Sequence, residues 1–344
     1  MGFYVFINDN TNSYVFALIS DSIVSMMSQG RLLCRLALQQ AKRRSFSMVG
    51  EVHKTAIKGF TAESAAKYDA GRPSYPAESL DRILEIMFSA KMDSDHAKVL
   101  ELGAGTGKFT DSFLSYASKS GVSGMYPVLD CMEYIATEPS EGFRETLTNK
   151  LSKFKSVVKV DHALGTSIPV PDNSLDAVIV AQAFHWMATV DTLREVHRVL
   201  IPYCPLVMIW NSYDYSYDWM RQIDEKILTP AYGEGVPRQQ NGKWEECFTP
   251  GVNKPAFSLL SKWQGQNVHV GDEETVVNRI MSTSVIVEKS AEDRAEVEKT
   301  LRAILATHPE LEEARRTKRF EISYITEIAW VVKHEVVNAA RACA

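Results

Sequence analysis

Short apolar runs alternate with helical stripes along the middle of the chain. The runs lie at 98–102, 133–137, 157–160, 175–181 and 205–210, and their length and apolar content predict buried parallel strands. Helical spacing fills the intervals, over 76–90, 108–117, 140–151 and 190–200. Alternating strands and helices predict a parallel sheet with helices on both faces. The carboxyl ends of the strands then share one edge, where such sheets bind ligands.

The pattern is less regular after residue 211. Residues 219–228, 272–283 and 291–306 have helical spacing. Residues 319–333 alternate in polarity and are rich in β-branched and aromatic side chains, which predicts an antiparallel strand at one edge of the sheet. The stretch 229–255 is rich in glycine, proline and asparagine, and this composition is typical of a mobile lid.

The amino-acid composition and net charge limit the classes of protein to which this chain can belong. The 344 residues are 45% hydrophobic and 24% charged, which fits one large globular domain with an extension, or two domains. The net charge is -5 and no basic stripe is present, so nucleic acid is not an expected partner. No apolar run approaches the ~20 residues that span a bilayer. The five cysteines are scattered and form no C-x-x-C pair, so the sequence indicates neither a disulfide framework nor a zinc site, and this usage is typical of a reducing compartment such as the cytoplasm.

The first 47 residues have a composition of their own. Residues 22–50 contain no acid and five basic residues, as mitochondrial transit peptides do, although the basic segment begins behind Asp9. A targeting segment, a disordered leader, or a functional protein that opens at Met48 all fit this pattern. We predict an extension over 1–47 and one folded domain over 48–344, with the cytoplasm as compartment and the mitochondrion as the alternative.

Three glycines follow the first predicted strand at alternate positions. Glu101 ends the apolar run, and Gly103, Gly105 and Gly107 come next. Glycines let the chain turn tightly and approach a ligand closely, and the helix after them offers free N–H groups.

The spacing distinguishes this loop from two phosphate-binding loops. A dinucleotide fingerprint requires glycine at 108, and a P-loop requires glycine at 102; Lys108 and Leu102 stand there instead. A carboxylate at position 101 also repels phosphate and attracts a cationic group.

Two further strand ends carry polar residues. Glu138 ends the second strand, where a carboxylate can accept hydrogen bonds from a ribose diol. The fourth strand leads to Gln182, followed by His185 and Trp186. Because strand ends meet at one edge, these residues are candidates for the same site.

These motifs carry a resemblance to a known family. The form E-x-G-x-G-x-G resembles class I S-adenosylmethionine-dependent methyltransferases. Together with Arg72-Pro-Ser-Tyr-Pro76, His185-Trp186 and Ile209-Trp-Asn211, it is similar to the methyltransferase type 11 family, nearest to its trans-aconitate-methyltransferase-like branch, over about residues 60–333. The resemblance implies a Rossmann-like, doubly wound seven-stranded α/β sheet, mostly parallel with one antiparallel edge strand.

The resemblance also implies roles for individual residues. The methionine part of S-adenosylmethionine would contact Gln182 and the loop residues Glu101, Gly103, Ala104, Gly105 and Gly107. Glu138 would hold the ribose, and Thr166 and Ser167 the adenine, although the acid common in the class near the adenine is missing from 165–167. The acceptor pocket would include Tyr68, Arg72, Trp186 and Trp210. No metal site is expected.

The expected reaction is methyl transfer from S-adenosylmethionine to a small molecule, with a carboxylate acceptor suggested by the resemblance alone. One alternative is a hydroxyl or amine acceptor with His185 as general base, since histidine titrates near neutrality; the other interpretation of His185 is a packing role. A second alternative is a non-catalytic scaffold that binds S-adenosylmethionine.

Overall fold

A computed structural model of the chain describes residues 71–89, 97–119, 132–154, 156–249, 251 and 255–335. The predicted extension over 1–47 and the predicted pocket residue Tyr68 lie outside the described residues. Among those described, no helix combines the length and apolar character needed to cross a membrane.

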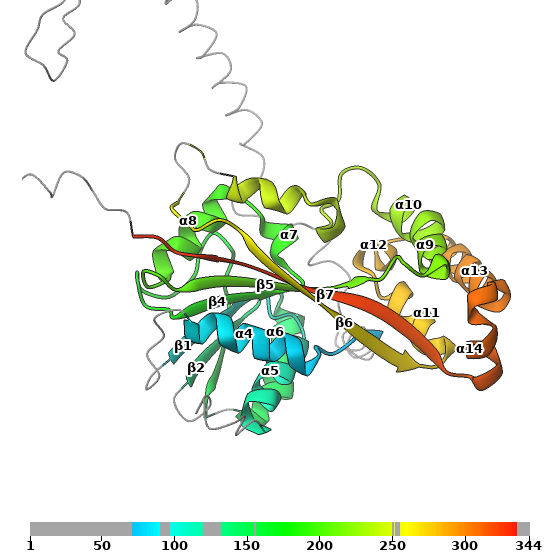
Figure 1. The fold of residues 1–344 in the computed structure, drawn as a ribbon, viewed down its shortest axis with the longest axis horizontal. Coiled ribbons are helices and arrows are strands. Elements are labelled where there is room, and N and C mark those ends of the chain that lie inside the picture. The colour runs from blue at the N-terminus through cyan, green and yellow to red at the C-terminus, as the bar shows by residue number, and fades with distance from the viewer. Residues whose placement is uncertain are drawn as a thin grey trace, which may run out of the picture. The chain divides into compact units, whose positions relative to one another are not determined.

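One seven-stranded sheet organises the described residues (Figure 1). Its order is β3-β2-β1-β4-β5-β7-β6. In this order the five strands from β3 to β5 are parallel to one another. This confirms the predicted Rossmann-like fold class. The strands are β1 (Ala97–Leu102), β2 (Met132–Thr137), β3 (Val158–Asp161), β4 (Ala177–Ala181), β5 (Pro205–Tyr213), β6 (Ser261–Gly271) and β7 (Phe320–Val332).

The prediction that residues 319–333 form the edge strand of the sheet is wrong. β7 is antiparallel to β5, as predicted, but β6 pairs with its other side and forms the edge. The sequence did not reveal β6 for two reasons. The exposed face of the strand carries polar residues such as Lys262 and Gln266, and Gly265 lies near the middle of the strand. Edge strands commonly have this polar character, which conceals them from an apolar-run criterion.

Helices cover both faces of the sheet because neighbouring strand residues point in opposite directions. Val99 packs in a core with α4 (Ala77–Ser89) and α5 (Lys108–Lys119), whereas Leu100 packs in a second core with α7 (Phe184–Met187) and α8 (Val190–Val199). The covering helices are α4 (Ala77–Ser89), α5 (Lys108–Lys119), α6 (Glu141–Lys150), η2 (Leu151–Phe154), α7 (Phe184–Met187) and α8 (Val190–Val199). All but η2 and the short α7 match helices predicted from the sequence.

A third core lies beyond the sheet centre and forms what we call the cap. It joins the end of β5 and the first half of β7 to the helices of the C-terminal part (Figure 1). Its buried residues include Trp219, Ile280 and Leu305. The cap helices are α9 (Asp218–Ile223), η3 (Asp224–Leu228), α10 (Thr229–Tyr232), α11 (Glu273–Met281), α12 (Ser284–Val287), α13 (Ala291–Thr307), η6 (Pro309–Leu311) and α14 (Glu312–Thr317).

The stretch predicted as a lid contains short helices. They include η4 (Gln239–Asn241) and η5 (Lys243–Phe248). Trp244 is buried, and its ring lies 4.7 Å from that of Trp210 and 6.2 Å from that of Phe184. These aromatic contacts attach the segment to the second core, and its movement as a lid stays a prediction.

Candidate active site

The glycine loop joins β1 to α5 through three left-handed residues. Gly103, Gly105 and Gly107 have φ angles of 74°, 58° and 79°, which side chains disfavour. At Gly107 an added Cβ would lie 2.6 Å from a methyl of Leu147. The N–H groups of Gly103 and Ala104 donate to the carbonyl of Thr137 at 2.9 and 2.8 Å, which fixes the loop beside β2.

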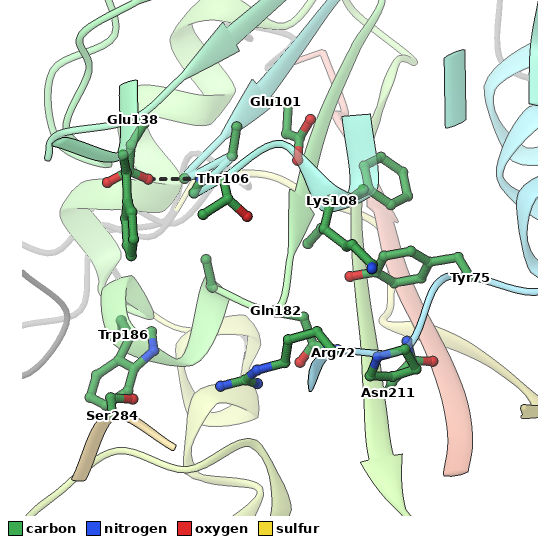
Figure 2. Close-up of a pocket in the computed structure, with 18 of the residues that line it drawn as sticks. Arg72, Tyr75, Glu101, Thr106, Lys108, Glu138, Gln182, Trp186, Asn211 and Ser284 are labelled. Atoms are coloured by element: carbon green, nitrogen blue, oxygen red, sulfur yellow. Dashed lines mark hydrogen bonds between the residues drawn. The ribbon is translucent and has the colours of Figure 1, made fainter. Parts of the chain in front are cut away.

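Glu138 holds the other side of the loop. The N–H of Gly105 donates to its Oε2 at 3.0 Å (Figure 2), and the N–H of Ser140 donates to its Oε1 at 2.9 Å. Burial raises the pKa of this carboxyl, and the two backbone hydrogen bonds oppose that rise. Each oxygen has a second acceptor position that remains available to a ligand hydroxyl.

Glu101 is fully buried at the end of β1 and only half satisfied. Thr110 and Tyr134 donate their hydroxyl protons to its Oε2 at 2.6 and 2.8 Å, while its Oε1 has no hydrogen-bond partner among the described residues. Burial raises the pKa of Glu101 to about 7. A buried acceptor without a donor is costly, so this oxygen fits a ligand that carries a cationic donor.

The loop and both acids line one cavity, the cofactor cavity, with about 1070 Å³ of space including its open mouth. Figure 2 shows Glu101, Thr106 and Glu138 at one end, and Arg72, Gln182 and Trp186 at the other. The structure therefore brings together most of the predicted cofactor residues. Sequence reasoning missed other lining residues, namely Lys108, Phe109, Pro139, Phe143, Met187, Asn211, Arg279 and Ser284.

A second cavity, the inner cavity, adjoins the first and has about 700 Å³ of space including its open mouth. The two cavities share six lining residues, which are Arg72, Gln182, Trp186, Asn211, Arg279 and Ser284. Arg238 also lines the inner cavity, and no Asp or Glu is among its described lining residues. Three guanidinium groups therefore line this cavity, and one of them, that of Arg238, is paired with Asp224 behind the wall.

The arginines are held in place by the cap. Arg279 is buried, donates from Nε to the hydroxyl of Tyr324 at 3.2 Å, and lies 4.8 Å from the centre of the Tyr213 ring. Arg238 pairs with Asp224 at 2.7 Å. Such contacts order the side chains before a ligand arrives, which reduces the entropy lost on binding.

Gln182 stands between the two cavities in a strained conformation. Its φ angle is 60°, uncommon for a residue other than glycine, asparagine or aspartate. Its N–H donates to the carbonyl of Ile209 at 2.8 Å, so the neighbouring strand β5 holds it there. Strained backbone of this kind is concentrated at functional sites.

His185 and Trp210 meet on the wall of the inner cavity. The indole N–H of Trp210 donates to Nδ1 of His185 at 3.3 Å. Burial lowers the pKa of His185 to about 3, so the imidazole is neutral at physiological pH. Its ring centre lies 4.9 Å from that of Trp186.

Three predicted cofactor residues, Gly107, Thr166 and Ser167, are not among the lining residues of either cavity. Thr166 and Ser167 are exposed on a turn after β3, and neither lines the cofactor cavity or the inner cavity. The structure therefore does not bring the predicted adenine contacts together with the rest of the site. Over the described ranges, no group of histidine, cysteine and acidic side chains has the arrangement of a metal site.

Comparisons with known proteins agree with this geometry. Residues 100–208 match the family model described as "Methyltransferase domain". The chain is 29% identical over 246 residues to an uncharacterised methyltransferase of Mycobacterium tuberculosis, covering 71% of this chain and 84% of that protein. It is 29% identical over 264 residues to an uncharacterised methyltransferase-like protein of Schizosaccharomyces pombe, covering 76% and 91%.

A solved structure supports the fold alone. A putative type II methyltransferase from Anaeromyxobacter dehalogenans aligns with a TM-score of 0.52 at 16% identity, covering 76% of this chain and 97% of that one. The fold, the family match and the relatives together define the enzyme class. The protein is a class I S-adenosylmethionine-dependent methyltransferase, and S-adenosylmethionine is its methyl donor.

Proposed function

We propose that this enzyme methylates a carboxylate of a small anionic molecule, as the resemblance to the trans-aconitate-methyltransferase-like branch suggests. The observation that carries the proposal is the inner cavity, which adjoins the cofactor cavity and is lined by Arg72, Arg238 and Arg279 with no lining acid among the described residues. Guanidinium groups bind carboxylates by paired hydrogen bonds. A carboxylate is ionised at neutral pH, so it attacks without a base.

Bound S-adenosylmethionine supplies an electrophilic methyl group: an acceptor oxygen lone pair forms the new O–C bond while the S–C bond breaks and leaves its electron pair on sulfur. The residues of this chain contribute position. We assign Glu101 to the ammonium group of the donor, because Glu101 lines the cofactor cavity and its buried Oε1 has no hydrogen-bond partner among the described residues. We assign Glu138 to the ribose hydroxyls. Gln182, at the shared wall, lies where the two reactants meet.

Positioning alone accounts for a large share of such a rate enhancement. Holding two reactants in line within contact distance supplies about 7–11 kcal/mol in favourable cases. The arginines orient the acceptor, and the aromatic wall formed by Trp186 and Trp210 reduces the water around it.

The alternative acceptor is a hydroxyl or amine with His185 as general base. The geometry favours this less, since the lone pair of Nδ1 already accepts a hydrogen bond from Trp210 and the pKa of the ring lies far below neutrality. A general base works best with a pKa near the operating pH.

The linkage of the product distinguishes the two acceptors. The full chain is incubated with S-adenosylmethionine labelled in its methyl group and a panel of mono-, di- and tricarboxylic acids, with Gly105→Arg as the inactive control. Labelled methanol released by mild alkali identifies a methyl ester and supports the proposal. A labelled product that resists alkali identifies an ether or amine and contradicts it.

The chain boundaries and compartment are separate proposals. We propose that residues 48–344 form the enzyme domain behind an extension over 1–47, in a cytoplasmic protein. A fluorescent fusion of the full chain tests this. Diffuse cytoplasmic fluorescence supports it, and mitochondrial fluorescence that is lost on deleting 1–47 supports the transit-peptide alternative.

A further inference from the structure

We propose that His185 donates a hydrogen bond from Nε2–H to the methyl acceptor, and that Trp210 fixes the tautomer in which it does so. His185 is thus an acceptor-binding residue, Trp210 is a positioning residue, and neither acts as a base. The role toward the acceptor rests on the proposed function, because it places the acceptor in the inner cavity. The tautomer itself is a property of the ligand-free protein.

The tautomer follows from the donor inventory of the two rings. Indole Nε1–H is a donor only, and a neutral imidazole has one donor and one acceptor nitrogen. Trp210 is 1% exposed, and its Nε1 lies 3.3 Å from Nδ1 of His185. Nδ1 is therefore the acceptor, and the single proton of the ring is on Nε2. The other tautomer would direct two N–H groups at each other.

The pair is rigidly held on both sides. His185 lies in α7 next to Phe184, which is fully buried and stacks on Phe248 with ring centres 5.4 Å apart. The Trp210 ring packs 4.7 Å from that of Trp244. A side chain whose neighbours are fixed in this way keeps its orientation, so the hydrogen bond between the two rings persists while ligands bind.

The surroundings also keep the ring neutral. Burial lowers the pKa of His185, and the charged residues that line the same cavity are the cations Arg72, Arg238 and Arg279. The other titratable lining residues are Tyr213, Tyr215 and Tyr232, and burial raises the pKa of Tyr213 and Tyr215 above their usual value. A neutral donor beside arginines suits an anion, since the ring adds a directed hydrogen bond.

A carboxylate acceptor uses both kinds of group. One oxygen attacks the methyl carbon, and the other accepts from Nε2–H and from a guanidinium. The hydrogen bond to the second oxygen fixes the rotation of the carboxylate about its C–C bond. This rotation directs a lone pair of the first oxygen at the methyl carbon. Trp210 occupies Nδ1 of His185, and His185 lines the inner cavity, so we assign Nε2–H to the acceptor bound there.

The first test reads the tautomer directly. Full-length protein labelled with ¹⁵N-histidine is studied by long-range ¹H–¹⁵N correlation, and the His185→Gln spectrum identifies one signal among the eight histidines. We expect the Nε2–H tautomer, unchanged from about pH 5.5 to about 8.5, a range in which ordinary histidines titrate. In Trp210→Phe we expect a tautomer mixture. A signal of the Nδ1–H tautomer, or one that titrates in this range, overturns the proposal.

The second test separates a donor from a base. Gln keeps an N–H donor but accepts no proton, and Phe keeps the ring without either property. We expect kcat/KM to fall about threefold in His185→Gln and tenfold or more in His185→Phe, with unchanged S-adenosylmethionine affinity in both. Equal losses in the two variants contradict the donor role. If no carboxylate is methylated at all, the proposed function fails, and the spectrum still decides the tautomer.

Discussion

The backbone N–H of Gly105 donates to the carboxylate of Glu138 across 3.0 Å, and this bond joins the loop after β1 to the end of β2. Glu138 also accepts from the N–H of Ser140. One buried carboxylate therefore holds the glycine loop and the start of α6 in a single arrangement. Its two roles, as a support for the loop and as a ligand-binding acid, are coupled.

Replacing Glu138 by Gln is expected to weaken S-adenosylmethionine binding by about tenfold or more. The amide NH₂ of Gln must face one of two backbone donors, so at least one hydrogen bond is lost, at a cost of about 1–3 kcal/mol. Titration calorimetry measures the affinity. Glu141→Gln, which changes an exposed acid at the start of α6, is the control, and equal affinities in the two variants would refute the assignment.

Replacing Glu101 by Gln is expected to stabilise the ligand-free protein at pH 8. Burial raises the pKa of Glu101 from 4.5 to about 7, so the folded protein holds a proton that the unfolded chain releases between these values. The stability contributed by this group is present below about pH 4.5 and is lost as the pH rises to about 7. Gln stays neutral, which avoids about 1–3 kcal/mol of this cost at pH 8. Thermal unfolding at pH 5 and pH 8 measures it; a variant less stable than wild type at pH 8 would contradict the expectation.

The affinity for S-adenosylmethionine is expected to fall as the pH is lowered below about 7. A cationic ammonium group binds the ionised form of Glu101, and protonation of that carboxyl competes with it. The limiting slope is tenfold per pH unit, for one proton. Calorimetry from pH 5.5 to 8.5 measures the slope, and Glu101→Gln should remove it together with part of the affinity. A pH-independent affinity in the wild type would show that Oε1 does not meet the cation.

Two glycines of the loop are expected to respond differently to alanine. Gly107→Ala places a methyl 2.6 Å from Leu147 at a φ of 79°, so we expect a loss of about 1–3 kcal/mol in unfolding free energy. Gly105→Ala meets no atom within 4 Å, so its stability loss is about 1 kcal/mol. Because Gly105 lines the cofactor cavity, its variant should lose affinity instead. Urea unfolding and calorimetry separate the two effects, and the reverse ranking of stabilities would refute this account of the loop.

Replacing Arg238 by Gln is expected to raise the KM for the acceptor about tenfold or more and to leave the affinity for S-adenosylmethionine unchanged. Arg238 lines the inner cavity and not the cofactor cavity, and a lost charged hydrogen bond costs about 1.5–3 kcal/mol. Arg316→Gln removes the same charge from an exposed position on α14. Steady-state kinetics with both variants separates a local contact from a change in net charge, which would affect both equally.

The sequence predicted the cofactor side better than the acceptor side, for a physical reason. β1, the glycine loop and α5 are contiguous, so Glu101 and Gly103 carry their relationship in their spacing. Arg279 reaches the same cavities from α11, where a buried arginine on a helix shows no local pattern. The contact between His185 and Trp210 joins α7 to β5 across 25 residues of sequence and was not visible in either segment.

The exposed turn that carries Thr166 and Ser167 illustrates an expectation set by resemblance. The residue types and their place after β3 agree with the resemblance, but neither residue lines the cofactor cavity or the inner cavity, so their contact with adenine stays a prediction. A turn of this kind has no apolar pattern that fixes its direction, so resemblance alone set the expectation. Adenine contacts are better sought among the cavity residues beside Glu138, such as Pro139 and Phe143.

The long strands β5 and β7 pass without interruption from the centre of the sheet into the cap, and the cap helices pack in a core of their own. Substitutions in the cap helices therefore change the stability of the cap core, which is separate from the cores that support the S-adenosylmethionine site. This arrangement lets the recognition of acceptors diverge between related enzymes while the chemistry stays constant. The cap is therefore the part to exchange when the same S-adenosylmethionine-binding domain is to act on a new substrate.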